Sequence, residues 1–295
     1  MGSGSYSSTE RGIRSTSLGY ATKSIHQTFT QRSLSNLMNP LDVKIRESRD
    51  SQEHPNSVAI LLALDLTGSM GNVPHTLVKT GLPNIMDGII QQGQPDPQLL
   101  FVGVGDHECD RSPLQVGQFE SSDALLDKWL TDIYLEGGGG GNNGESYLLA
   151  WYFAGYHTSI DCFEKRKQKG FLFTIGDEPN LTSLPSYNVK SIMGNGQYQD
   201  YSAAELLEKA RETYNVYHIH VRETHNGKNQ SVVDGWKQVL GENLIEVQDS
   251  SEIAGLIAEI VVKNTSTETN VNVKSTNDVV NKTEKVKSKI VAGIL

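Results

Sequence analysis

The residues best suited to chemistry in this chain gather where an apolar run ends. The run from Val58 to Leu64 has no polar interruption, and Asp65, Thr67 and Ser69 follow it directly. A carboxylate and two hydroxyls at i, i+2 and i+4 offer three hard oxygen donors within one tight turn. Donors of this kind, with waters completing the shell, suit an octahedral Mg²⁺ or Mn²⁺ better than zinc. The alternative is a helix N-cap followed by a glycine turn, because short clusters of Asp, Ser and Thr also serve that purpose.

Two later segments carry further donors. Residues 136–146 hold five consecutive glycines, followed by Asn142 and Glu145. Because each glycine loses much backbone entropy on folding, so many in a row favour a close approach of the backbone to a bound group. Residues 170–180 form another apolar run, and Asp177 stands at its end. The carboxyl ends of parallel strands share one edge of a sheet, so we expect these groups to meet there.

The elements that must position these groups alternate between strands and helices from residue 58 onward. We expect strands at 58–65, 99–106, 114–119, 170–177, 215–221 and 243–247, and helices at 73–92, 122–134, 146–156, 202–214, 231–240 and 252–263. This alternation predicts an α/β fold with a doubly wound, mostly parallel central sheet, one antiparallel edge strand and helices on both faces. Residues 181–201 show no periodicity, so they are interpreted as a binding loop or as a disordered insertion.

The three motifs, in this order, resemble those of the von Willebrand factor A (VWA) domain family. That family has a Rossmann-like fold with a metal-ion-dependent adhesion site (MIDAS) built from Asp-x-Ser/Thr-x-Ser, a Thr of a second loop and an Asp after a later strand. The loop Gly-Gly-Gly-Asn-Asn-Gly-Glu is closest to the Gly-Gly-Gly-Asp-x-Pro-Glu (GGGDxPE) of the alpha-kinase-type subgroup, with Asn142 at its Asp and Glu145 at its Glu. The resemblance spans roughly residues 57–262.

The resemblance implies a non-enzymatic, metal-dependent protein-interaction module that binds Mg²⁺ or Mn²⁺. The implied ligands and outer-shell groups are Asp65, Thr67, Ser69, Asn142, Glu145 and Asp177. The chain departs from the family in two places, because no Thr occupies the second loop and Asp177 stands one residue later than usual. One coordination position would stay open for an Asp or Glu of a protein ligand, so that the metal bridges two chains. Family members often accompany an ATPase-type chaperone, which is therefore one possible partner.

Two other classes of function stay open. In the first, a structural or assembly protein, the ends of the chain hold copies together by self-association and the metal site is vestigial. In the second, the chain is an enzyme or a nucleic-acid-binding component, as in Ro-type ribonucleoproteins. His107 lies among carboxylates that suit acid–base work, but a polar surface loop explains this cluster better. No phosphate-binding loop or nucleophile elbow is present, and residues 51–262 carry a formal charge of −15, which repels phosphates. We therefore expect no enzyme and no nucleic acid partner.

Composition divides the chain into three parts. Residues 1–56 are rich in Ser, Thr, Arg and Gln, and we expect them to form an arm that is partly disordered or docks on the protein. We expect the VWA domain at 57–263 and a flexible C-terminal tail at 264–295. No apolar segment approaches the ~20 residues of a membrane span, and the N-terminus lacks the apolar region of a secretory signal. Two cysteines are too few for a disulfide framework. These features predict a cytoplasmic protein that does not bind a membrane.

Overall fold

The centre of the protein is a six-stranded sheet. The computed structural model describes residues 4–94, 96–137, 142 and 144–265. The strands lie in the order β10-β9-β6-β2-β3-β4, and all neighbours are parallel except β3 and β4. Their bounds are β2 Val58–Asp65, β3 Pro97–Val104, β4 Leu114–Val116, β6 Gly170–Gly176, β9 Tyr214–Val221 and β10 Leu244–Val247. The predicted doubly wound, mostly parallel sheet with one antiparallel edge strand is confirmed.

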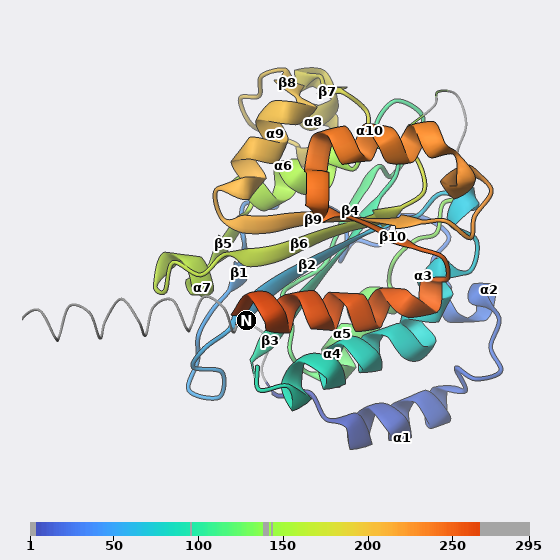
Figure 1. Cartoon of the computed structure of the whole chain (residues 1–295), viewed down its shortest axis with the longest axis vertical. Helices are drawn as coiled ribbons and strands as arrows, with labels where there is room; N and C mark the ends of the chain where they lie inside the picture. The colour runs from blue at the N-terminus through green and yellow to red at the C-terminus, as the bar shows by residue number, and fades with distance from the viewer. Residues whose placement is uncertain (1–3, 95, 138–141, 143, 266–295) are drawn as a thin grey trace, which may run out of the picture.

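Helices cover both faces of the sheet (Figure 1). One face carries α6 (Leu148–Tyr156), α9 (Ala203–Arg211) and α10 (Gln230–Leu240); the other carries α4 (Leu82–Gln91), α5 (Asp123–Thr131) and a helix at 253–265. Every residue of β2 is buried, because each face of this strand packs under one helical layer. This is why its sequence is an unbroken apolar run. No described helix is long and apolar enough to cross a membrane.

The predicted helix at 73–92 is divided. It consists of α3 (Val73–Thr76), a π-helical segment (Leu77–Gly81) and α4. Pro83 lies in the first turn of α4 and has no N–H to donate to the preceding turn, so the wider π-helical turn before it accommodates the missing bond.

The interpretation of 181–201 as a segment without regular structure is wrong. It contains β7 (Ser183–Leu184), α8 (Ser186–Met193) and the start of β8 (Tyr201–Ser202), and β7 pairs antiparallel with β8. Helix α8 has only two turns, with Val189 and Met193 as its buried residues. Two apolar positions are too few to show a helical period in the sequence.

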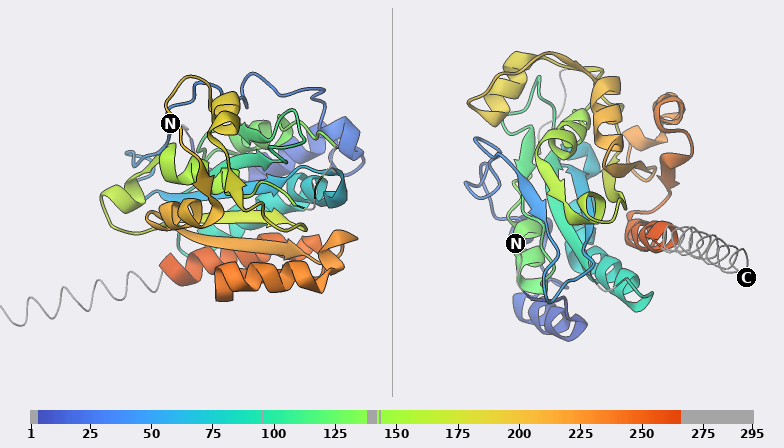
Figure 2. Two further views of the ribbon diagram at one scale, coloured as in Figure 1. Left: turned by 90° about the horizontal axis from the view of Figure 1, so that it is seen from above. Right: turned by 90° about the vertical axis from the view of Figure 1, so that its left-hand side faces the viewer.

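The N-terminal segment packs against the domain that follows it. It contains α1 (Ser8–Leu18), α2 (Ile25–Thr28) and β1 (Arg46–Ser48), and β1 pairs with β5 (Thr158–Ile160), which leads into α7 (Asp161–Glu164). Helix α1 is the outermost layer below the sheet in Figure 1, and the right-hand view of Figure 2 shows the same position.

Among the contacts that anchor this segment are those of Arg11 and of the Met38 carbonyl. Arg11 is only 2% exposed and forms ion pairs with Asp123 and Asp127 of α5. The carbonyl of Met38 accepts a hydrogen bond of 2.7 Å from the N–H of Val116. The segment therefore covers part of the open edge of the sheet at β4. The flexible tail was predicted to begin at 264. Residues 264 and 265 end the helix at 253–265, and 266–295 lie outside the described residues.

Candidate functional site

The site lies at the carboxyl edge of two neighbouring strands, β2 and β6. The chain leaves β2 toward β3 on one side and leaves β6 toward β9 on the other. At such a switch point the two connections diverge and leave a crevice, which is where open α/β sheets bind ligands. Asp65 is the last residue of β2, and Asp177 follows β6 directly. The fold thus brings together two carboxylates that are far apart in the sequence.

Four of the predicted ligands form one hydrogen-bonded chain. Asp65 Oδ1 accepts hydrogen bonds from the backbone N–H of Thr67, at 2.9 Å, and from its Oγ1, at 2.6 Å. Thr67 Oγ1 lies 3.1 Å from Ser69 Oγ. The Ser69 hydroxyl donates to Asp177 Oδ1 at 2.8 Å. The carboxylates and hydroxyls of the first and third motifs therefore meet at one point of the edge.

The two carboxylates at this point are buried, and neither forms an ion pair with a described residue. Asp65 and Asp177 are both 0% exposed. Burial raises the pKa of Asp65 to about 7, the charge of Asp177 adds to the rise, and the hydrogen bonds from Thr67 and Tyr147 oppose it. Asp177 Oδ2 has no hydrogen-bond partner among the described residues. Two buried carboxylates with a free oxygen and two adjacent hydroxyls fit the hard oxygen donors that a divalent cation needs.

Glu145 is a third carboxylate beside this group. It is 5% exposed, and its Oε2 finds no partner within the described structure. Burial, followed by the charge of Asp65, raises the pKa of Glu145 to about 10. Its backbone is fixed, because its N–H donates to Pro179 O and its carbonyl accepts from the N–H of Leu181, both at 2.9 Å. Glu145 lines a cavity of about 490 Å³ together with Thr67 and other residues of the edge.

Asn142 lines the same cavity but stands outside the hydrogen-bonded chain. Its side-chain amide donates to Glu108 Oε2 at 2.7 Å. No group of three or more His, Cys, Asp or Glu side chains in the described part of the chain is arranged to hold a metal ion. A cation at this edge would therefore depend on the hydroxyls of Thr67 and Ser69 as well as on the carboxylates.

Sequence reasoning missed two residues that shape the site. The hydroxyl of Tyr147 donates to Asp65 Oδ2 at 2.7 Å, so both oxygens of the Asp65 carboxylate accept hydrogen bonds. Gly176 makes room for that ring, because a Cβ at this position would lie 1.9 Å from the Tyr147 hydroxyl. Tyr147 precedes α6, which begins at Leu148 rather than at 146. No local pattern in the sequence links these two residues to Asp65.

His107 is not on the surface, so the explanation of its cluster as a polar surface loop is wrong for this residue. It is 7% exposed, and burial lowers its pKa. The Oγ of Ser146 lies 2.7 Å from its Nδ1 and accepts a hydrogen bond from its backbone N–H at 2.8 Å. Ser146 is fully buried and presents no accessible nucleophile. The pair therefore holds the loop after β3 against the start of α6.

Comparison with known proteins gives matches among solved structures only. No family model matches the sequence, and no curated protein does. The pilus adhesin SpaC of Lactobacillus rhamnosus GG shares 11% identity over 74% of this chain and 31% of its own, with a TM-score of 0.49. Proximal thread matrix protein 1 of the mussel byssus, with a zinc-occupied MIDAS motif, shares 13% over 74% of this chain and 49% of its own, with a TM-score of 0.43. The SpRpn10 VWA domain shares 12% over 66% of this chain and 92% of its own, with a TM-score of 0.40. This chain thus spans half or less of the first two proteins, and similarity at this level identifies no function for it.

Proposed function

We propose that the chain is a VWA-type, metal-dependent protein-binding module. Mg²⁺ or Mn²⁺ is held at the carboxyl edge of β2 and β6 and bridges to an Asp or Glu of a partner protein. The observation that carries this proposal is the hydrogen-bonded chain from Asp65 through Thr67 and Ser69 to Asp177. Both carboxylates are buried, and Asp177 Oδ2 has no hydrogen-bond partner among the described residues. These four residues would hold the ion, directly or through water.

The remaining predicted residues take supporting roles in this proposal. Glu145 and Asn142 line the same cavity as Thr67 and Ser69, and the resemblance to the GGGDxPE subgroup places them at its Glu and Asp, so they would complete the inner or outer shell. Tyr147 holds Asp65 in place through its hydroxyl. When bound, the divalent cation would supply positive charge and one open position at an otherwise acidic edge. An acidic partner would be repelled there without it.

The geometry favours binding over catalysis. In the described structure the hydroxyls of Thr67 and Ser69 contact each other, Asp65 and Asp177, and no histidine that would activate them as nucleophiles. The N-terminal segment packs on its own domain, so the assembly alternative would depend on the tail, of which 266–295 lie outside the described residues. We therefore propose a non-enzymatic, cytoplasmic module, for which an ATPase-type chaperone is one candidate partner on the resemblance alone.

The proposal is tested by thermal unfolding in chelator and again with Mg²⁺ or Mn²⁺. A cation at 100 times its dissociation constant should stabilise the native state by about 2.7 kcal/mol, which raises the melting temperature by roughly 5–10 °C. Asp177→Asn should lose this shift. Asp234→Asn, at an exposed position of α10, should keep it. An equal shift in Asp177→Asn, or no shift of the wild type at millimolar cation, would contradict the proposal.

A further inference from the structure

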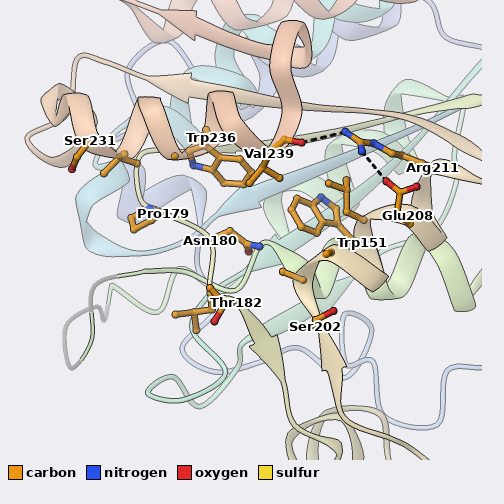
Figure 3. Close-up of a pocket in the computed structure, with 16 residues that line it drawn as sticks. Trp151, Pro179, Asn180, Thr182, Ser202, Glu208, Arg211, Ser231, Trp236 and Val239 are labelled. Carbon is orange, nitrogen blue, oxygen red and sulfur yellow. Dashed lines mark hydrogen bonds and ion pairs between the residues drawn. The ribbon is translucent and has the colours of Figure 1, made fainter.

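A second cavity lies between α9 and α10, on the helical layer above the sheet (Figure 3). Its volume is about 550 Å³, which is in the range of sites for small molecules. Its lining includes one face of each helix, the wall formed by 179–182 and one residue of α6. The large apolar side chains around it are Trp151, Leu181, Leu207, Val232, Trp236 and Val239.

Small residues leave this space open between the two helices. Ala203 and Ala204 of α9 and Gly235 of α10 line it, and a Cβ added at Gly235 would meet no atom within 4 Å. The rings beside it are fixed in place. Trp236 donates its indole N–H to Glu178 O at 2.9 Å and meets Trp151 edge to face, with ring centroids 6.1 Å apart. A hollow bounded by fixed rings cannot close by a small shift of side chains.

A charged donor accompanies the apolar walls. Arg211 lies at the rim, where its guanidinium pairs with Glu208 at 2.9 Å, and both side chains are partly exposed to solvent. An exposed pair of this kind is weak and exchanges readily for another anion. Trp151 of α6 also lines the cavity and is 0% exposed.

We propose that this cavity binds a small molecule with an apolar, ring-sized body and an anionic oxygen head. The body would lie between Trp236, Leu207 and Val232, where it removes apolar surface from water. The head would take hydrogen bonds from Arg211. The cavity shares no lining residue with the cavity lined by Thr67, Ser69 and Glu145, so its binding can be measured in the absence of metal.

The test is a titration of the full chain with 1-anilinonaphthalene-8-sulfonate, followed by its fluorescence, in chelator so that the metal proposal plays no part. The expected result is saturable binding of one molecule per chain. Gly235→Leu fills the hollow and should weaken binding by about tenfold or more. Gly255→Leu is the matched control, because it too is a helical glycine whose added Cβ would meet nothing within 4 Å, and it should bind as the wild type does. Equal affinity in the two variants would overturn the proposal.

Two further variants keep the test decisive. Ala204→Leu fills the same hollow from α9, so it replaces Gly235→Leu should that variant fail to fold by circular dichroism. Arg211→Gln should weaken binding of the sulfonate several-fold, whereas Glu208→Gln should strengthen it, because Glu208 competes for the same guanidinium. Neither change should affect the neutral analogue N-phenyl-1-naphthylamine. If both charge variants leave sulfonate binding unchanged, the anionic head is wrong.

Discussion

The buried carboxylate of Asp65 predicts how stability depends on pH in the absence of metal. Burial raises its pKa to about 7 in the folded protein, compared with about 3.9 in an unfolded chain. Between these values the folded state binds more protons than the unfolded state. The contribution of Asp65 to the free energy of unfolding in chelator should therefore fall as the pH rises from about 4 to about 7, and stay low above that window.

Replacing this residue by asparagine removes the charge at nearly the same size. A pKa difference of about 3 units corresponds to about 4 kcal/mol against the ionised form. Asparagine also weakens the two hydrogen bonds from the hydroxyls of Thr67 and Tyr147, at about 1 kcal/mol each. Asp65→Asn should thus be more stable than the wild type by about 2 kcal/mol at pH 8 in chelator, or roughly 4–8 °C in melting temperature.

Thermal unfolding at pH 5 and pH 8, with and without Mg²⁺, checks this prediction. At pH 5 the wild-type carboxyl is protonated, so the advantage of Asp65→Asn should disappear. Added Mg²⁺ should stabilise the wild type and not the variant. Asp234→Asn serves as the control for loss of a surface charge. The reasoning is refuted if Asp65→Asn is less stable than the wild type at pH 8 in chelator, or gains the same stability at both pH values.

Two substitutions test packing, one at the anchor of the N-terminal segment and one beside the site. Arg11→Ala leaves buried Asp127 of α5 without an ion-pair partner, whereas Asp123 keeps Arg14, and the change should cost about 3–5 kcal/mol in urea unfolding. Lys209→Ala, which breaks an exposed pair, should cost less than about 1 kcal/mol, and similar losses in the two variants would contradict the anchoring role of Arg11. Gly176→Ala forces the Tyr147 hydroxyl away from Asp65, so it should destabilise by about 1–3 kcal/mol and reduce the Mg²⁺-induced shift, which calorimetry in chelator and in Mg²⁺ would measure. A Gly176→Ala protein with the wild-type shift would show that Tyr147 does not position the carboxylate.

The parts of the fold that sequence could predict are those with a local signal. An apolar run such as 58–64 fits a strand that is buried on both faces, and the Asp that follows it necessarily lies at the strand end. The strands at Val58–Asp65 and Gly170–Gly176 therefore place Asp65 and Asp177 at one edge. The spacing of Thr67 and Ser69 within the same turn adds their hydroxyls.

The parts that sequence could not predict depend on contacts between distant residues. Tyr147 reaches Asp65 across 82 positions, and Arg11 reaches Asp123 across 112. Neither residue stands in a motif, and an arginine among Ser and Thr is typical of an exposed arm. Its burial depends on the two carboxylates that α5 presents to it and on the carbonyl of Val78. The cavity between α9 and α10 is of the same kind, because it arises where small residues of two separate helices face each other.

The central claim is that a divalent cation sits at Asp65, Thr67, Ser69 and Asp177 with one position open to a carboxylate. Binding of Mn²⁺, followed by electron paramagnetic resonance and by water-proton relaxation, tests it most directly. We expect one site per chain that carries exchangeable water, loses relaxation enhancement when acetate is added, and is absent in Asp177→Asn. Failure of the wild type to bind Mn²⁺, or equal binding by Asp177→Asn, would contradict the claim.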